Sequence, residues 1–328
     1  MNSPKRVGII GLGVALPERR VTNHDIAKSV ETDDEWIRTR TGIEERRIAG
    51  DGETSSVLGA KAAQAALADA GVAVDDVDLI VVATTTSDML FPSTACVIQH
   101  RIGNTKAGCF DVSAACAGFV YALSVAHQFV LSGQSRCVLV IGAEVLSKFV
   151  NWKDRGTCIL FGDGAGAAVV APVERGGIES IYLGADGAAG KFLKIPAGGS
   201  LMPPTHETID QGLHYVQMDG KEVFKFAVRI MGDAAEEALR RAGKTFADID
   251  CLVPHQANIR IIQSAADRMK LPIEKVYLNV SRYGNMSSAS TIVALAEAVR
   301  DGKIKRGDTV VLVAFGAGLA WGSCVIEW

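Results

Sequence analysis

Three residues in this sequence have side chains that could do chemistry together: a cysteine, a histidine and an asparagine. Cys116 lies in VSAACAGF, where alanines surround the thiol and a glycine follows two residues later. His255 follows an apolar segment in LVPHQAN, and Asn285 follows a glycine in YGNMSSAS. A thiol can attack a thioester and hold the acyl group, whereas imidazole and amide N–H groups can stabilise an oxyanion. Each residue alone is more often structural, so the chemistry depends on whether the fold brings the three together.

An internal duplication of the sequence suggests that the fold brings these three residues together. Residues 66–83 read ALADAGVAVDDVDLIVVA, and residues 238–255 read ALRRAGKTFADIDCLVPH, 172 positions later. FDVS at 110–113 and LNVS at 278–281 form a second aligned pair, and each precedes a helical segment and a continuous apolar strand. Such strands are typical of sheets covered on both faces, so the sequence predicts an α/β fold built from two duplicated halves. The predicted halves are residues 1–172 and residues 173–328.

The duplication puts Cys116 and Asn285 at nearly matching positions, each where a strand gives way to a helix. In a structure with approximate twofold symmetry, the two helix N-termini should meet near the axis. A helix N-terminus carries unpaired N–H groups and a positive dipole end, which lower the pKa of a thiol placed there. The helix after Cys116 is apolar nearly all round, which indicates a central, buried position. His255 should lie at the carboxyl end of its strand, where Pro254 ends the ladder and α/β sheets place ligands.

Composition narrows the class of protein. The chain has 328 residues, 48% apolar and 6% aromatic residues and a net charge of −3, which argues against bulk attraction to nucleic acid. The seven cysteines include no C-x-x-C pair, so neither a disulfide framework nor a zinc site is expected. The apolar run near the N-terminus is too short for a signal peptide and is typical of a first β-strand. No run of 18 apolar residues predicts a membrane span, so we expect a reduced, cytoplasmic protein.

Several segments together resemble one enzyme family. DVSAACAGF, VPHQANIRII and YGNMSSAS are similar to the three active-site motifs of 3-oxoacyl-[acyl-carrier-protein] synthase III, the initiating condensing enzyme of type II fatty-acid synthesis. The resemblance covers the whole chain, including DEWIRTRTGI and AFGAGLAWGS, and it implies the five-layer αβαβα fold of the thiolase-like superfamily. It also implies a homodimer that condenses an acyl-CoA primer, with acetyl-CoA as the expected one, with malonyl-acyl carrier protein. No cofactor or metal is implied, because coenzyme A and phosphopantetheine are parts of the substrates.

The resemblance assigns roles to the three reactive residues. Cys116 would be the nucleophile that carries the acyl group, and His255 and Asn285 would donate hydrogen bonds to the enolate formed by decarboxylation. The backbone N–H groups of Cys116 and Ala317 would form an oxyanion hole. Ala317 stands where glycine is frequent in the family, so this donor requires that its φ angle is negative.

A coenzyme A site is expected near a short helix. Thr32–Glu35 reads as a capping box that opens this helix, and Gly42 would end it. Trp36 and Arg40 are four residues apart and so share one face, where the indole either packs the helix or binds a flat, phosphorylated ligand. The resemblance favours the adenine and phosphates of coenzyme A, with Arg155 on the other side of the adenine ring. It also implies that three residues line the pantetheine tunnel: Gly220, Phe224 and Asn258.

Other segments concern packing, the carrier protein and the dimer. FGDGAGAA at 161–168 lacks the Lys-Ser/Thr of a phosphate-binding loop and runs into a strand, so we interpret it as a close-packing segment. Phe91 matches a family position that reaches across the dimer toward the partner's acyl pocket. A basic patch around the tunnel mouth would bind the acidic carrier protein; its candidate residues are Lys225, Arg229, Arg260, Arg268 and Lys270.

Two alternatives to the initiating enzyme remain open. One is a related Cys-His-Asn condensing enzyme that uses a longer primer in secondary metabolism, and the other is a non-catalytic acyl-CoA or carrier-binding subunit. A degradative thiolase needs a second catalytic cysteine in a C-x-G context, which Cys324 in GSCVIEW does not provide. Elongating condensing enzymes have two histidines, whereas Asn285 occupies the second position here.

Overall fold

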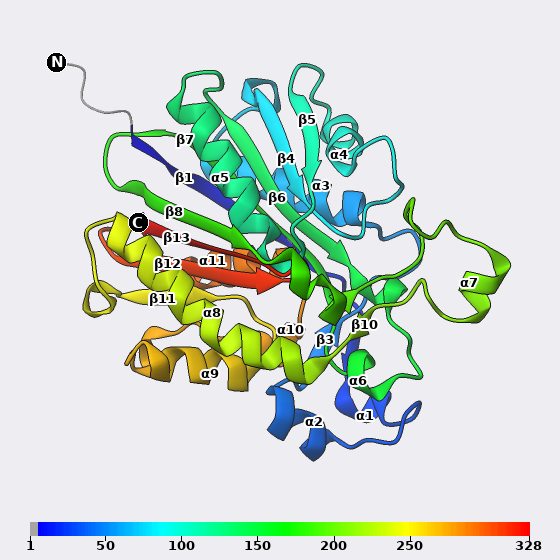
Figure 1. Ribbon diagram of the computed structural model, residues 1–328. Coiled ribbons are helices and arrows are strands. Elements are labelled where there is room, and N and C mark those ends of the chain that lie inside the picture. Colours follow the sequence, from blue (N-terminus) through cyan, green and yellow to red (C-terminus); the bar gives the residue numbers. More distant parts are fainter. Residues whose placement is uncertain (1–5) are drawn as a thin grey trace.

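The computed structural model describes residues 6–328, which form two central β-sheets with helices on and between them (Figure 1). The first sheet has the order β1-β7-β6-β4-β5. Its strands are β1 (Arg6–Ala15), β7 (Asp163–Val173), β6 (Val138–Val145), β4 (Leu79–Ala83) and β5 (Gly108–Val112). The second sheet has the order β11-β12-β13-β8. Its strands are β11 (Cys251–Pro254), β12 (Thr309–Gly316), β13 (Ala320–Glu327) and β8 (Gly177–Ala185).

The two sheets repeat one topology, which confirms the duplication read from the sequence. β4 is parallel to β6, β6 is antiparallel to β7, and β7 is antiparallel to β1. In the second sheet β11 is parallel to β12, β12 is antiparallel to β13, and β13 is antiparallel to β8. A single parallel bridge between Leu252 and Val276 stands in the place of β5. The chain changes sheets between β7 and β8, and the division at residues 172 and 173 stays a prediction.

The helices complete five layers, as expected. The outer face of the first sheet is covered by α3 (Ser55–Ala70) and α4 (Thr94–Ile102), and that of the second by α8 (Gly220–Arg241) and α9 (Ile259–Arg268). Between the sheets lie α5 (Gly118–Leu131) and α11 (Ser288–Arg300). Strand side chains alternate between these layers: Val138 and Val140 of β6 pack inward, whereas Leu139 and Ile141 pack outward.

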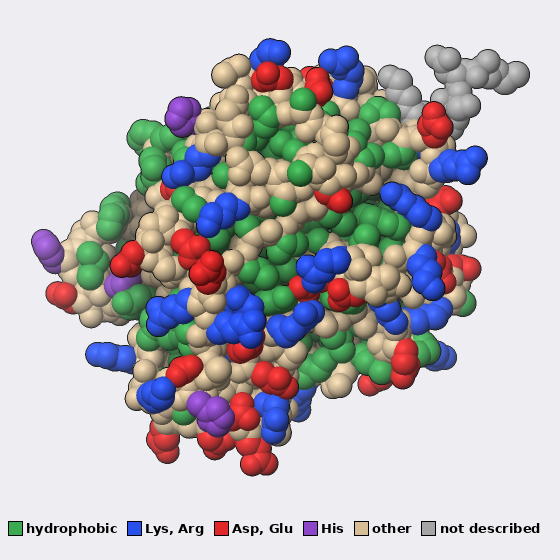
Figure 2. Space-filling model, turned by 180° about the vertical axis from the view of Figure 1, so that it is seen from behind, with side chains coloured by type: hydrophobic (Ala, Val, Ile, Leu, Met, Phe, Trp, Pro, Cys, Tyr) green, Lys and Arg blue, Asp and Glu red, His purple; other side chains and the backbone are tan. Residues whose placement is uncertain are grey.

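Short elements surround this core. They are α1 (Asn23–Ile26), α2 (Asp34–Thr41), α6 (Arg155–Cys158), α7 (His206–Asp210), α10 (Val280–Tyr283), β2 (Arg20–Thr22), β3 (Glu45–Arg47), β9 (Leu193–Lys194) and β10 (Gln217–Met218). The arm that carries α7 stands away from the body, at the right of Figure 1 and, after the 180° turn, at the left of Figure 2. Figure 2 also shows Lys and Arg interspersed with Asp and Glu over that face, in keeping with the small net charge.

The helices differ in how they begin. Each outer helix of eight or more residues starts with a side-chain cap: Asp33 for α2, Thr54 for α3, Ser93 for α4, Asp219 for α8 and Asn258 for α9. The central helices α5 and α11 have no such cap. The capping box predicted at Thr32–Glu35 is wrong in detail, because the Asp33 carboxylate caps the Trp36 N–H and takes the place of Thr32. Gly42 ends α2 in the left-handed conformation, at φ 78°, as predicted.

Glycines let the central layer approach the first sheet closely. A Cβ atom on Gly162 would lie 2.3 Å from the Tyr283 carbonyl oxygen, and one on Gly164 would lie 2.7 Å from the Met286 sulfur. A Cβ atom on Gly142 would lie 2.6 Å from the Ser288 carbonyl oxygen, at the start of α11. The interpretation of FGDGAGAA as a close-packing segment is therefore confirmed.

Residues 6–328 carry neither a membrane-spanning helix nor a cluster of metal ligands. None of the helices in this part of the chain combines the length and the apolar character that crossing a bilayer requires. Nor do His, Cys, Asp and Glu side chains of residues 6–328 gather in a group of three or more that could hold a metal ion.

Candidate active site

Cys116, His255 and Asn285 meet at one cavity of about 250 Å³. Cys116 lies in a turn just before α5, His255 follows β11, and Asn285 lies between α10 and α11. The prediction from the duplicated positions is therefore confirmed, because both halves of the chain contribute to one site. All three side chains are buried, with exposed fractions of 6%, 1% and 8%, so a substrate meets them only through the cavity.

Backbone geometry fixes the thiol. The preceding residue, Ala115, has a φ angle of 45°, an unfavourable conformation for a residue with a Cβ atom. Gly316 at the end of β12 passes so close that a Cβ atom there would lie 2.5 Å from the Cys116 nitrogen. These constraints hold Cys116 between the N-terminus of α5 and the loop that follows β12.

The pKa of the Cys116 thiol moves against the prediction. Burial raises it to about 12, although hydrogen bonds to the side chains of Ser287 and Asn285 lower it. The expected lowering at a helix N-terminus is thus wrong, because burial in a low dielectric outweighs the favourable groups nearby. The resting side chain is a thiol, and its proton must leave when the sulfur reacts.

His255 is a neutral imidazole in an apolar setting. Burial lowers its pKa to about 3, and its ring packs edge-on against Phe315 with the centroids 5.9 Å apart. Neither ring nitrogen has a hydrogen-bond partner among residues 6–328, so both are available to a ligand. Gln256 holds the loop: its amide donates to the carbonyls of Pro254 and Tyr277 at 2.9 and 3.0 Å.

Backbone hydrogen bonds fix the position of Asn285. Its N–H donates to the Leu160 carbonyl at 2.8 Å, and its own carbonyl accepts from the Gly162 N–H at 3.0 Å. Its Oδ1 atom accepts from the Ser287 N–H at 2.8 Å. Because Oδ1 is occupied in this way, the Nδ2 group is the part of the amide that faces the thiol. The side chain therefore presents hydrogen-bond donors to the cavity.

The cavity extends away from the thiol as a tunnel. Of the residues predicted to line the pantetheine tunnel, Gly220, Phe224 and Asn258 all line it, as does Arg40. Asn258 also joins two helices: its side chain caps α9, and its Nδ2 group donates to the Arg40 carbonyl at 3.0 Å.

Trp36 lies outside this tunnel, between two arginines. The guanidinium groups of Arg40 and Arg155 each lie 4.8 Å from the centre of the indole ring. Trp36 and Arg40 share a face as predicted, and Arg155 contacts the indole itself and donates to the Glu31 carbonyl at 3.0 Å. An aromatic ring flanked by two cations suits a flat, anionic ligand.

A second, mostly apolar cavity of about 230 Å³ also reaches the thiol. Cys116, Phe161 and Leu193 line both cavities. The other residues around the second cavity include Thr85, Ala115, Leu146, Ile195, Val216, Ser287 and Ala317. Ala317 is not among the non-glycine residues with positive φ, which within residues 6–328 are Ala115, Lys270 and Ser287. The condition for its backbone N–H to serve as an oxyanion donor is therefore met.

Comparison with known proteins agrees with this geometry. Residues 110–187 match the family 3-Oxoacyl-[acyl-carrier-protein (ACP)] synthase III, and residues 239–328 match its C-terminal part. The beta-ketoacyl-[acyl-carrier-protein] synthase III of Caldanaerobacter subterraneus subsp. tengcongensis is 57% identical over 98% of this chain and 97% of its own. The chain belongs to the 3-oxoacyl-[acyl-carrier-protein] synthase III family. It is thus an acyl-transferring condensing enzyme, the initiating one of fatty-acid synthesis.

Solved structures of synthase III superpose closely on this fold. The enzyme of Thermus thermophilus is 48% identical, with a TM-score of 0.91 over 98% of this chain and 99% of that one. The priming beta-ketosynthase of the R1128 polyketide biosynthetic pathway is 40% identical, with a TM-score of 0.91 over 99% and 98% of the two chains. The thiolase-like fold class is therefore confirmed.

The remaining predicted site residues are spread more widely. Phe91 is 84% exposed and lines neither cavity of the chain described here. In the predicted basic patch, Arg260 lines the tunnel, whereas Lys225 pairs with Glu222 at 2.7 Å and Arg268 pairs with Asp233.

Of the five cations, Arg260 alone lines the tunnel, and the carrier-protein patch stays a prediction. Arg268 lies eight residues after Arg260 on α9, about 12 Å along the helix axis, and Lys270 lies beyond its end. Lys225 and Arg229 lie in the first three turns of α8, nearer to Gly220 and Phe224 of the tunnel wall.

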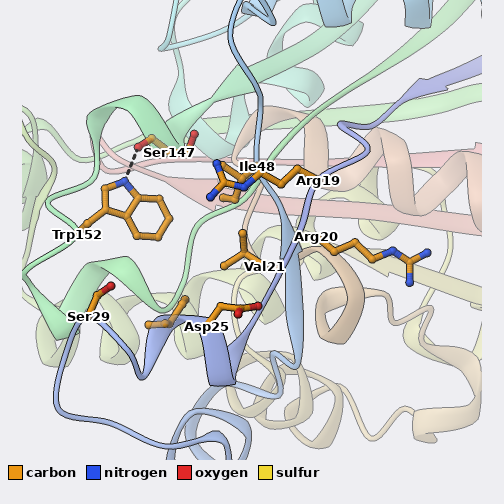
Figure 3. Close-up of a pocket in the computed structure, with 9 residues that line it drawn as sticks. Arg19, Arg20, Val21, Asp25, Ser29, Ile48, Ser147 and Trp152 are labelled. Carbon is orange, nitrogen blue, oxygen red and sulfur yellow. Dashed lines mark hydrogen bonds between the residues drawn. The ribbon is translucent and has the colours of Figure 1, made fainter.

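A larger hollow of about 540 Å³ lies elsewhere on the molecule (Figure 3). Arg19, Asp25 and Trp152 are among its lining residues, and the Trp152 indole N–H donates to the Ser147 carbonyl at 3.1 Å. Neither Cys116 nor His255 lines this hollow, so its size gives it no part in thiol chemistry. No sequence pattern indicated this hollow, because its walls join residues 19–48 to Ser147 and Trp152.

Proposed function

We propose that the enzyme condenses an acyl-CoA primer, with acetyl-CoA as the expected one, with malonyl-acyl carrier protein. The products would be 3-oxoacyl-acyl carrier protein, CO₂ and coenzyme A. The observation that carries the proposal is the pair of cavities that meet at Cys116. The tunnel suits a pantetheine arm, and the apolar cavity suits the acyl chain.

In the first half-reaction, the Cys116 sulfur attacks the acyl-CoA carbonyl and coenzyme A leaves as its thiolate. The tetrahedral intermediate places a negative charge on the carbonyl oxygen. The backbone N–H groups of Cys116 and Ala317 are the proposed donors to this oxygen, since both residues line the acyl cavity.

In the second half-reaction, malonyl-carrier protein loses CO₂ and its thioester becomes an enolate. His255 and Asn285 are the proposed donors to the enolate oxygen. A pKa of about 3 keeps the imidazole neutral, so that it donates through its single N–H. The enolate carbon then attacks the acyl-cysteine, and the Cys116 sulfur is released as a thiolate.

Trp36, Arg40 and Arg155 are the proposed site for the nucleotide of coenzyme A. Trp36→Ala and Arg155→Ala should therefore raise KM for acyl-CoA and leave decarboxylation by the acylated enzyme unchanged. Equal losses in both half-reactions would count against the assignment.

We further propose a cytoplasmic homodimer. Three consecutive apolar residues support an interface, because Met89, Leu90 and Phe91 are 49%, 84% and 84% exposed. β5 is also an edge strand, and its open side is available for pairing. Sedimentation that finds a fully active monomer at assay concentration would overturn the dimer.

The central test is acyl transfer itself. Incubation with acetyl-CoA should increase the mass of the intact protein by one acetyl group, and subsequent malonyl-carrier protein should release CO₂ and remove that mass. A panel of longer and branched acyl-CoAs measures which primer is preferred. A protein that gains no acyl mass from any of them would overturn the proposed function.

A further inference from the structure

A buried arginine without an ion-pair partner lies beside the loop that holds Asn285. Arg46, in β3, has an exposed fraction of 0% and is one of the largest fully buried side chains of residues 6–328. No carboxylate in that part of the chain forms an ion pair with it. A buried charge without such a partner is costly, so packing alone would favour an apolar side chain here. The contacts of Arg46 indicate what the charged group does instead.

The guanidinium group of Arg46 joins two segments of the chain. On one side, Nη1 donates to the Asn23 Oδ1 atom at 2.9 Å and to the Val21 carbonyl at 3.2 Å. On the other side, Nη2 donates at 2.7 Å to the carbonyl of Ile159, the residue that ends α6. Because these nitrogens belong to one rigid, planar group, Arg46 fixes the distance between the start of α1 and the end of α6.

The Ile159 carbonyl belongs to the loop that holds Asn285. The carbonyl of the next residue, Leu160, accepts from the Asn285 N–H at 2.8 Å, and the Gly162 N–H donates to the Asn285 carbonyl at 3.0 Å. Leu160 and Asn285 also line the tunnel. The hydrogen bond from Arg46 therefore lies one residue away from the bonds that fix the Asn285 backbone.

The aliphatic part of Arg46 packs against the same region. A Cβ atom on Gly162 would lie 3.2 Å from the Arg46 Cβ atom, and one on Gly284 would lie 3.6 Å from it. Gly284 directly precedes Asn285, and its φ angle of 63° favours glycine. Arg46 thus lies beside both chain segments that meet at Asn285.

We propose that Arg46 is a positioning residue that holds residues 159–162 where Asn285 can donate to the enolate oxygen. The bond to Ile159 keeps the Leu160 carbonyl within reach of the Asn285 N–H, and the fixed backbone in turn places the Asn285 Nδ2 group in the cavity. This assignment rests on the proposed function, since it requires Asn285 to act during decarboxylation.

A purely structural role, in which Arg46 stabilises the fold without acting on Asn285, is the competing explanation. Arg46→Lys separates the two. Lysine keeps the charge, but its single ammonium group cannot replace the fork that joins Asn23 to Ile159. Acylation should depend on this fork much less than decarboxylation does, because Cys116 is held between α5 and the loop after β12.

The experiment measures CO₂ release from malonyl-carrier protein by the full-length, acylated enzyme. Arg46→Lys should release CO₂ about 10- to 100-fold more slowly, as expected when a reacting group is displaced by about 1 Å. The rate of acetylation by acetyl-CoA should be preserved. In an Asn285→Ala background, Arg46→Lys should cause no further loss of CO₂ release, since residues that act as a unit are not additive.

Arg47→Lys is the matched control, because it makes the same change at the next position of β3. The Arg47 guanidinium donates at 3.1 and 3.4 Å to the carbonyls of Pro17 and Glu18, in the segment that follows β1. Arg47→Lys should leave CO₂ release unchanged. Hydrogen–deuterium exchange at the Asn285 N–H should be faster in Arg46→Lys and unaltered in Arg47→Lys.

Three results would overturn the proposal: normal CO₂ release by Arg46→Lys, equal losses in both half-reactions, or a loss that simply multiplies that of Asn285→Ala. If Arg46→Lys does not fold, Arg46→Gln takes its place with the same expectations, because its amide is uncharged and lacks the fork. If neither variant folds, the structural explanation holds and the proposal fails. An unchanged enzyme that releases no CO₂ from malonyl-carrier protein would instead contradict the proposed function.

Discussion

The helices on the outside of the two sheets and the two helices between them solve the same problem differently. The first N–H groups of any helix lack partners within it. On the outside, Asp, Asn, Ser or Thr side chains cap them, as Ser93 caps α4 at 3.2 Å. At the centre, α5 and α11 begin at Gly118 and Ser288 without a side-chain cap.

The two central helices lack the stabilising cap of the outer helices, and their N-termini lie at the active site. A cap adds about 1 kcal/mol to a helix. The central helices have no such cap, and packing between the two sheets stabilises them instead. Their uncapped ends lie beside the thiol and beside Asn285, where N–H groups and the positive dipole end can act on a substrate oxygen. Two of the residues with unfavourable φ angles, Ala115 and Ser287, also lie at the N-termini of the central helices.

The largest effect should come from removing the nucleophile at the start of α5. Cys116→Ala should gain no acyl mass from acetyl-CoA, because no other buried thiol lines either cavity among residues 6–328. Intact-protein mass spectrometry measures this directly. Cys324→Ala, a buried thiol away from both cavities, is the matched control and should acylate normally.

At the start of α11, Asn285→Ala should separate the half-reactions. It should still gain acyl mass, but CO₂ release from malonyl-carrier protein should fall by about 10²–10³, as for one lost oxyanion donor. His255→Ala should lose a similar factor. A variant of Asn285 that decarboxylates normally but cannot be acylated would reverse the division of labour proposed here.

The buried centre should also give the protein a dependence on pH. Burial lowers the pKa of His255 from 6.5 to about 3, so between these values the unfolded chain binds a proton that the folded protein does not. The contribution of this group to the free energy of unfolding should therefore be fully present above pH 6.5. It should fall as the pH drops from 6.5 toward 3, by at most about 1.4 kcal/mol per pH unit. Urea unfolding at several pH values should show a shallower slope for His255→Gln, whereas His100→Gln on the exposed surface of α4 should keep the original slope.

Close packing at the start of α11 can be tested with one methyl group. Gly142→Ala would bring a Cβ atom to 2.6 Å from the Ser288 carbonyl oxygen. Overpacking of this kind costs about 1–3 kcal/mol and should also displace the Asn285 loop, so CO₂ release should fall. Gly187→Ala adds a Cβ atom that meets nothing within 4 Å and should leave both stability and decarboxylation unchanged.

The smallest effect should be found on the outside. Ser93→Ala removes the side-chain cap of α4 and should lower the free energy of unfolding by about 1 kcal/mol, without altering acyl transfer. A drop in activity larger than the drop in folded protein would mean that the outer caps also serve the site, and the contrast between the two sets of helices would fail.

The sequence predicted features that depend on order along the chain. The repeat of helix, turn and strand indicated two matching sheets, and the motifs around Cys116, His255 and Asn285 indicated one site. Features that depend on tertiary surroundings were missed or wrong. The direction of the Cys116 pKa shift depends on burial, and the contact between Ser288 and Glu144 joins residues 144 positions apart. Neither property produces a recognisable pattern in the sequence. The cap at Asp33 was missed for a different reason, because Thr32 beside it is an equally suitable residue type for a cap.

The glycines of FGDGAGAA have a consequence for how freely this sequence can diverge. Gly162 directly precedes β7, and Gly164 and Gly166 lie within it. A Cβ atom on any of the three would lie within 2.7 Å of an atom in the segment from Tyr283 to Ile292. Even alanine, the smallest alternative, would therefore separate β7 from the segment that holds Asn285. In a library of all single substitutions selected for growth, these three positions should tolerate almost nothing, whereas the exposed Pro172 near the end of the same strand should tolerate many substitutions. Conservation of these glycines would reflect the short distance between β7 and the segment that holds Asn285, which leaves no room for a side chain at the three positions.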